Sequence, residues 1–359
     1  MVIQLSGTPE PTRDLGSERR LWHDGSRYTP SLGCTNCPEQ SVCGGLRIGR
    51  ALYDCLGLCS CKDRTTCDAV CRNKPVDFAR RVREVGGFAF DNVPRAPILP
   101  TPFLPVVVPT LYHGNRRVAS FSAAAVCLSL YRVVQRHTGE IRYSNGAEIA
   151  TAFGITPNTP LILTGTAADP PLERWWSLSS KRRAAIRALR NFNISLVTTP
   201  NYSLFIDQPR WDDLHSMKRI AIVHEEFLSE GVPTALHVNA RTDRDWDRWT
   251  TYIADRPEVT HIAFEFATGA GWAKRVKWHT NKLSALARDI NRPLHLVVRG
   301  GKNVLPDLAT AFSSITLLET SVFMKTMRRQ RAILRRSGKS ELAAVAHDRN
   351  RTTRQVACR

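Results

Sequence analysis

Eight of the ten cysteines in this 359-residue chain lie between positions 34 and 71. Thiolates repel one another and oxidise readily, so a short segment with little apolar content keeps that many of them mainly when a metal neutralises their charge and stabilises the fold. In a reducing compartment, such clusters are more often metal sites than disulfides. The pattern predicts a metal-binding module with the ligands Cys34, Cys37, Cys43, Cys55, Cys59, Cys61, Cys67 and Cys71.

The intervals between these cysteines leave the cofactor open between an iron-sulfur cluster and zinc. Structural zinc usually takes paired C-x2-C hooks, and only Cys34 and Cys37 form such a pair. Iron-sulfur clusters tolerate more varied spacing. The runs C-x2-C-x5-C and C-x5-C-x3-C resemble parts of the auxiliary-cluster domains of radical enzymes. The C-x3-C-x2-C signature of the catalytic cluster in those enzymes is absent, which argues against radical chemistry in this chain.

Glu265 is the carboxylate most suited to acid or base catalysis, because it lies between Phe264 and Phe266 near the end of an apolar run. Burial raises the pKa of a carboxyl and lets it exchange protons near neutrality. The alternative is a core glutamate paired with an arginine such as Arg299. We predict that a catalytic site with Glu265 also contains the substrate-orienting residues Asn201, Asp207 and Asn239. Asp207 could instead begin a turn, and Asn239 could cap the loop that follows it.

A basic, glycine-containing run at positions 299–302 predicts an anion-binding site. Two cationic side chains flank a glycine pair whose backbone N–H groups can approach a ligand closely. The alternative is an ordinary glycine turn after a strand. The predicted anion-binding residues are Arg299, Gly300, Gly301 and Lys302.

The charge of the chain favours a polyanionic partner. Lysine and arginine total 51 against 32 acidic residues, which gives a net charge of +19. From Lys325 to the end, eleven basic residues face only two acidic ones. Such a tail can displace counterions from nucleic-acid phosphates, although it could also be a solvated tail. The predicted nucleic-acid contacts are Arg328, Arg329, Arg331, Arg335 and Arg336.

Trp175 and Trp176 precede the basic run Lys181-Arg182-Arg183, with Arg187 and Arg190 further on. Alternating aromatic and basic groups occur in single-strand nucleic-acid sites. Helix packing explains the tryptophans equally well.

The elements that must position these groups alternate in type after a proline-rich stretch. Apolar residues make up 42% and charged residues 23%, as in an ordinary globular protein. Short β-branched runs predict strands, and amphipathic runs between them predict helices. The predicted strands are 104–112, 160–163, 194–198, 235–238, 261–266, 294–298 and 315–318. The predicted helices include 118–137, 180–191, 213–230 and 272–290.

This alternation predicts an α/β fold with a parallel sheet, either a barrel or a doubly wound sheet. We favour a (β/α) barrel-like, TIM-barrel-like sheet, because most of the predicted strands end in polar or flexible residues that a barrel gathers on one face. No dinucleotide-binding or P-loop glycine motif follows a strand. The predicted organisation is an arm (1–33), a Cys-rich module (34–90), a Pro-rich connector (91–105), the barrel-like domain (106–324), and a basic C-terminal helix and tail (325–359).

Residues 193–320 resemble a family known as domain of unknown function 4417, found in bacteria and their phages. The resemblance rests on Thr199-Pro200-Asn201-Tyr202-Ser203, on Asp207-x-Pro209, and on the helix that ends at Gly231 with the strand after it. It implies a phage or mobile-element context and no particular activity.

Together these features predict a metal- or iron-sulfur-containing barrel enzyme that acts on nucleic acid or a nucleotide-like anion, with base modification as one reaction class. The alternative is a non-catalytic DNA-binding or regulatory protein that uses the cysteine module and the basic tail. The first residues lack a secretory signal, and no apolar run reaches the roughly 20 residues of a membrane span. We therefore expect a cytoplasmic protein.

Overall fold

The computed structural model describes residues 47–48, 51–52, 81, 83–114, 119–135, 137–204, 210–268, 270, 273–327, 330–334 and 340–344. None of the helices within these ranges is long and apolar enough to cross a membrane.

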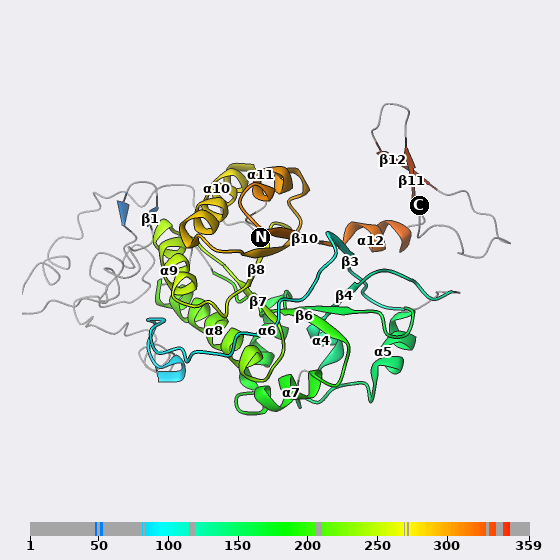
Figure 1. Cartoon of the computed structure of the whole chain (residues 1–359), viewed down its shortest axis with the longest axis horizontal. Coiled ribbons are helices and arrows are strands. Elements are labelled where there is room, and N and C mark those ends of the chain that lie inside the picture. Colours follow the sequence, from blue (N-terminus) through cyan, green and yellow to red (C-terminus); the bar gives the residue numbers. More distant parts are fainter. Residues whose placement is uncertain are drawn as a thin grey trace, which may run out of the picture. The chain divides into compact units, whose positions relative to one another are not determined.

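Eight parallel strands form the central sheet (Figure 1). In sheet order, β3 pairs with β10, and the sheet continues through β9, β8, β7, β6 and β5 to β4. Apolar, largely buried runs build these strands, as expected for a parallel sheet covered by helices. Their bounds are β3 Val107–Pro109, β4 Val126–Ser129, β5 Leu161–Thr164, β6 Ile194–Thr198, β7 Thr234–His237, β8 His261–Glu265, β9 His295–Arg299 and β10 Ser314–Glu319.

The two edge strands meet just beyond β3. Thr110 forms a parallel bridge with Cys127 of β4, and the Leu111 N–H donates to the Cys127 carbonyl at 2.9 Å. The sheet is therefore nearly closed and barrel-like. This confirms the prediction of a barrel-like α/β fold rather than the open doubly wound alternative.

Helices link most of the successive strands, because parallel neighbours require a crossover. Local signals fix several helix ends. Thr242 and Asp245 form a reciprocal capping box at the start of α9, and Asn145 caps α5 by accepting from the Glu148 N–H. The helices are α4 Leu130–Val133, α5 Gly146–Phe153, α6 Asp169–Ser177, α7 Lys181–Leu189, α8 Arg210–Ser229, α9 Asp243–Ala254, α10 Ala273–Ile290, the 3-10 turn η3 Lys302–Val304, α11 Leu305–Ala309 and α12 Ser321–Met327.

The helix predicted over 118–137 is wrong. Residues Val126–Ser129 form strand β4, and only Leu130–Val133 are helical. Cys127 pairs with Ile162 of β5 in a parallel register and is fully buried. A continuous apolar run of this kind suits a strand buried on both faces as well as a buried helix, so periodicity alone cannot separate the two. The seven strands expected from the sequence are all present.

The inner face of the sheet carries a layer of apolar side chains. The register and the alternation of side chains along each strand place one residue from every strand on this face, together with Ala125, which precedes β4. Several are small, as the narrow interior of an eight-stranded barrel requires. The layer consists of Val108, Ala125, Cys127, Ile162, Leu196, Ala235, Ala263, Val297 and Leu318.

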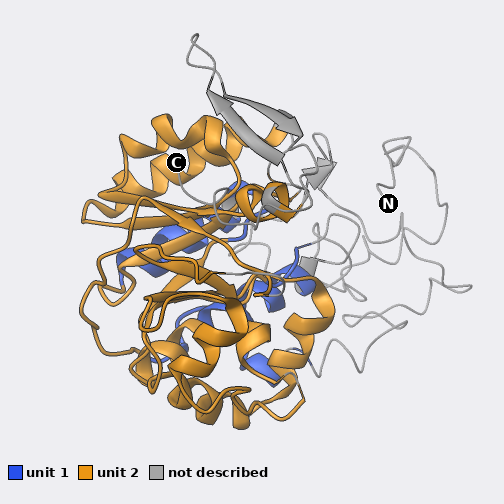
Figure 2. Cartoon of the chain, turned by 90° about the vertical axis from the view of Figure 1, so that its right-hand side faces the viewer, with its two compact units in different colours: residues 1–94, 202–222, 239–255 blue, residues 95–201, 223–238, 256–359 orange. Residues whose placement is uncertain are grey.

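The chain divides into two compact units (Figure 2). The second unit, residues 95–201, 223–238 and 256–359, contains the whole eight-stranded sheet. It also contains an antiparallel pair formed by β11 (Gln330–Leu334) and β12 (Ser340–Ala344).

The first unit comprises residues 1–94, 202–222 and 239–255. It contains the short antiparallel pair β1 (Arg47–Ile48) and β2 (Ala51–Leu52). In it, Phe90 stacks on Trp249 of α9 with ring centroids 4.8 Å apart. The ammonium group of Lys218 in α8 is almost wholly buried and donates to the Ala89 carbonyl and the Asn92 side chain. Burying a charge without such partners would be costly, so these contacts tie residues 89–92 to α8.

Candidate active site at the strand ends

The inner face of the sheet becomes polar just beyond the apolar layer. Side chains two positions further along a strand return to the same face, and for all eight strands that position is polar. For β3 and β10 it lies just past the last strand residue. In a barrel of parallel strands, this C-terminal end is where substrates bind. The polar ring consists of Thr110, Ser129, Thr164, Thr198, His237, Glu265, Arg299 and Thr320.

Glu265 and Arg299 form an ion pair in this ring. They are register partners at the ends of β8 and β9, and Arg299 Nη1 donates to Glu265 Oε2 at 3.1 Å. The other carboxylate oxygen accepts from the Ala267 N–H at 2.7 Å. Burial raises the pKa of Glu265 above its ordinary value, although Arg299 and the Ala267 N–H partly oppose the rise. The predicted burial of Glu265 is confirmed. Its ion pair with Arg299 matches the alternative prediction, a core glutamate paired with an arginine.

His237, the last residue of β7, lies in the same ring and is buried. Its Nε2 lies 3.4 Å from Thr166 Oγ1, and its backbone N–H donates to Thr199 Oγ1 at 2.9 Å. Burial and the nearby Arg299 charge lower the pKa of His237 to about 3, so its imidazole is neutral at physiological pH. Sequence reasoning did not place it among the catalytic residues. Its position as a histidine at a strand end was the available signal.

Two buried side-chain nitrogen atoms of the polar ring have no hydrogen-bond partner among the residues that the structure describes. These are His237 Nδ1 and Arg299 Nε. A buried polar atom without a hydrogen bond costs about 1–3 kcal/mol. Such atoms at a strand-end site are suited to accept or donate to a substrate.

The three predicted orienting residues have different surroundings. Asn201 follows β6 and belongs to the same unit as Glu265. Asn239 belongs to the first unit, where its side chain donates to the Tyr202 carbonyl at 2.8 Å and its own carbonyl accepts from Trp249 Nε1 at 2.7 Å. These contacts match the loop-stabilising alternative for Asn239. Asp207 lies outside the described residues.

The glycine pair of the predicted anion site has a packing explanation. Gly300 and Gly301 have φ values of 77° and 67°, which favour glycine. A Cβ on Gly300 would lie 2.7 Å from the Ala267 nitrogen, and one on Gly301 would lie 2.7 Å from the Phe266 ring. The close approach of 300–301 to the strand-end segment 266–267 therefore requires glycine whether or not an anion binds.

The other members of the predicted anion site separate into two places. Arg299 is paired with Glu265, whereas Lys302 forms an ion pair with Glu319 at the end of β10. Gly300 and Lys302 line a pocket of about 350 Å³ beside the ends of β9 and β10. The remaining lining residues are Leu317, Leu318, Glu319, Thr320, Ser321 and Lys325.

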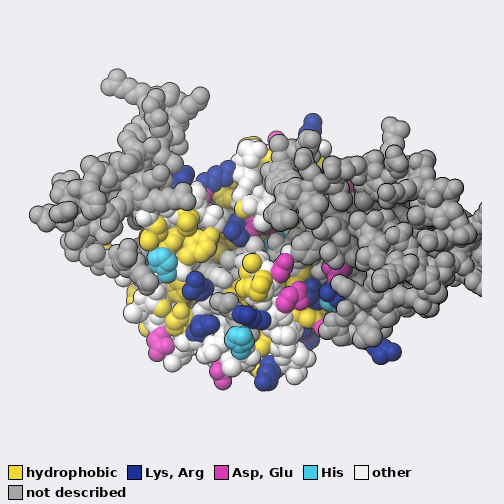
Figure 3. Space-filling model, turned by 180° about the vertical axis from the view of Figure 1, so that it is seen from behind, with side chains coloured by type: hydrophobic (Ala, Val, Ile, Leu, Met, Phe, Trp, Pro, Cys, Tyr) yellow, Lys and Arg dark blue, Asp and Glu magenta, His cyan; other side chains and the backbone are white. Residues whose placement is uncertain are grey.

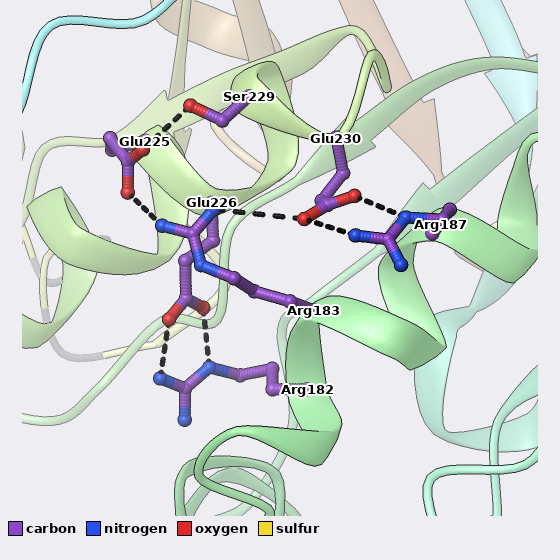
Figure 4. A network of polar contacts seen from close by, with 7 residues as sticks. All are labelled: Arg182, Arg183, Arg187, Glu225, Glu226, Ser229 and Glu230. Atoms are coloured by element: carbon purple, nitrogen blue, oxygen red, sulfur yellow. Dashed lines mark hydrogen bonds and ion pairs between the residues drawn. The ribbon is translucent and has the colours of Figure 1, made fainter.

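Three arginines of α7 form ion pairs within the protein (Figure 4). Arg182 forms two hydrogen bonds with Glu226 of α8, at 2.5 and 2.7 Å. Arg183 pairs with Glu225 at 2.7 Å, and Arg187 pairs with Glu230 at 2.8 Å. Trp175 is buried and stacks on Phe227, with ring centroids 6.0 Å apart. Helix packing therefore accounts for Trp175, as the alternative for the tryptophans predicted.

Most of the predicted metal and nucleic-acid residues lie outside the described part of the chain. This holds for all eight cysteines between positions 34 and 71 and for Arg328, Arg329, Arg335 and Arg336. Arg331 lies in β11, opposite Ala343. In the described ranges, no group of three or more histidine, cysteine, aspartate or glutamate residues could hold a metal. Cys127 is buried in the apolar layer, and burial raises the pKa of its thiol to about 12.

On the face drawn in Figure 3, the visible lysine and arginine side chains are scattered among hydrophobic ones rather than gathered into one patch. No continuous basic surface is therefore visible among the described residues of that face.

No family model matches the chain, and no curated protein or solved structure is significantly similar to it.

Proposed function

We propose that the chain is an enzyme that acts on nucleic acid or a nucleotide-like anion at the C-terminal end of its barrel-like sheet. The observation that carries the proposal is the polar ring above the apolar layer, where Glu265 and Arg299 are paired and His237 is buried. Residues that only stabilised the barrel would be expected to be apolar, or to have a hydrogen-bond partner for every buried polar atom.

Each of these residues has a chemical role in the proposal. The raised pKa of Glu265 suits a carboxyl that gives a proton to a leaving group or takes one from a nucleophile. Arg299 supplies a fixed positive charge beside it and stabilises negative charge that develops in the transition state. The neutral imidazole of His237 offers Nδ1 as a hydrogen-bonding atom to the substrate.

The proposal retains a cysteine module that binds an iron-sulfur cluster or zinc, and a basic tail that contacts nucleic-acid phosphates. The support is the density of cysteines between positions 34 and 71 and the excess of arginine after position 325. Anaerobic purification followed by an absorption spectrum and metal analysis tests the module. Brown protein with iron and sulfide identifies a cluster, and colourless protein with zinc identifies a structural metal. Protein without metal rejects the module.

The enzyme proposal is tested with Glu265→Gln in the full, anaerobically purified chain. Nucleotides and short oligonucleotides are incubated with the protein, and products are followed by mass spectrometry. We expect the substitution to lower turnover by about 10²- to 10⁴-fold, whereas Glu140→Gln at an exposed position leaves turnover unchanged. If both Glu265→Gln and Arg299→Ala leave oligonucleotide binding and the biological effect of the protein unchanged, the result would favour the non-catalytic DNA-binding alternative.

A further inference from the structure

The pocket beside the ends of β9 and β10 has features that Glu265 chemistry does not use. Its volume of about 350 Å³ is at the lower end of the range for ligand pockets. Its walls combine two aliphatic side chains, Leu317 and Leu318, with charged groups. β9 and β10 are the seventh and eighth strands of the barrel along the chain.

Two lysines and one carboxylate set the charge of this pocket. Glu319 accepts hydrogen bonds from the Ser321 N–H at 2.7 Å and from the Ser321 hydroxyl, and it pairs with Lys302. Burial alone would raise the pKa of Glu319, but the hydrogen bonds from Lys302 and Ser321 outweigh burial and leave its pKa below the ordinary value. The carboxylate is therefore ionised and fully engaged, and its charge is balanced by one lysine.

Lys325 supplies the remaining charge. It lies in α12, lines the pocket, and has no ion-pair partner among the described residues. Lys302 also retains donor capacity, because an ammonium group has three N–H bonds and Glu319 takes one of them. Two lysines with unused N–H donors thus line the pocket, and its net charge is positive.

We propose that this pocket binds a phosphate group of the substrate, with Lys302 and Lys325 as its ligands. Two point charges with several donors suit a tetrahedral anion that has many acceptor oxygens. Barrels of parallel strands frequently bind phosphate beside the loops after their seventh and eighth strands. In this arrangement Glu319 is a positioning residue that holds Lys302 at the pocket wall.

The chain connects the phosphate subsite directly to the proposed catalytic group. Gly300 lines the pocket, and the preceding residue, Arg299, pairs with Glu265. A substrate whose phosphate lies against Lys325 can therefore present an adjoining part toward Glu265. This placement rests on the proposed function, whereas phosphate binding to the pocket can be tested without any reaction.

The experiment is isothermal titration calorimetry of the full chain at constant ionic strength. The probes are inorganic phosphate, adenosine monophosphate and a short single-stranded DNA. Lys325→Ala should weaken phosphate binding by about 10-fold or more, because a charge-assisted contact is lost. Lys325→Arg should restore most of the affinity. Lys181→Ala, which removes an exposed lysine from α7, should leave it unchanged.

The probes distinguish the source of the phosphate. A Lys325-dependent affinity for adenosine monophosphate indicates a mononucleotide, and one found only for DNA indicates a backbone phosphate. Unchanged phosphate affinity in Glu265→Gln shows that phosphate binding in the pocket does not depend on the proposed catalytic carboxyl, so the two proposals are tested independently. Phosphate that binds without saturation, or equally well to Lys325→Ala and the wild type, would overturn the subsite.

Discussion

Glu265 and Arg299 face each other across β8 and β9, and the two ends of their ion pair have different access to solvent. The Glu265 side chain is 2% exposed, whereas that of Arg299 is 27% exposed. Arg299 can therefore reach an anion at the strand ends while Glu265 stays shielded from water. Because Arg299 holds down the pKa of Glu265, a substrate anion that draws Arg299 away would raise that pKa further and favour the protonated acid.

The ion pairs between α7 and α8 should differ widely in their effect on stability (Figure 4). Arg182 and Glu226 have side chains only 6% and 8% exposed, so Arg182→Ala leaves a buried carboxylate unpaired. We expect it to lower the free energy of unfolding by about 3–5 kcal/mol. Arg187 is 64% exposed, so Arg187→Ala should cost no more than about 1 kcal/mol. Urea unfolding measures both, and similar losses would show that burial does not determine the effect.

Acid should destabilise the fold because three buried histidines resist protonation. The pKa values of His224, His237 and His261 are each lowered to about 3, mainly by burial. Below about pH 6.5 the unfolded chain binds protons that the folded chain does not, so stability falls as the pH drops toward 3. The raised pKa of Glu265 favours the folded state as the pH falls, but this is one group and the histidines with lowered pKa values are three.

We therefore expect the free energy of unfolding to decrease steadily between pH 6.5 and 4.5 by at least about 1 kcal/mol per pH unit. The measurement is urea unfolding at a series of pH values. His224→Gln removes one titrating group, and it should make the slope shallower. A flat profile over this range would mean that these imidazoles are hydrated or paired in solution.

Gly300 should tolerate no side chain. Its φ of 77° is strained for other residues, and a Cβ would meet the backbone at Ala267. Gly300→Ala should destabilise the protein by about 2 kcal/mol or more. Gly146, the first residue of α5, is the matched control, because a Cβ there meets nothing within 4 Å. Gly146→Ala should be neutral or stabilising by up to about 1 kcal/mol, as thermal unfolding can show.

The order and type of most elements could be read from the sequence because strand and helix patterns alternate with clear breaks. Strand β4 could not, since the run around Cys127 is apolar on both faces and its extended form depends on pairing with β5. Closure of the sheet depends on the same strand, through the bridge between Thr110 and Cys127.

The site was partly predictable for a similar reason. Glu265 and Arg299 stand out because charged residues end otherwise apolar strands, and their pairing follows from neighbouring strands. The partners of the other groups depend on side-chain packing. Lys325 looked like part of a basic tail, yet it lines a pocket with Glu319 and Ser321. The glycines at 300 and 301 looked like an anion cradle, although close backbone packing alone requires them.

The pKa of Glu265 is the most direct test of a catalytic carboxyl at the strand ends. It can be measured by carbon-13 NMR of the labelled side-chain carboxyl during a pH titration of the full chain. We expect a value above that of an ordinary glutamate, and a further increase in Arg299→Gln, because burial dominates and Arg299 opposes it. A pKa at or below the ordinary value, unchanged by the Arg299 substitution, would contradict a buried proton donor at this site.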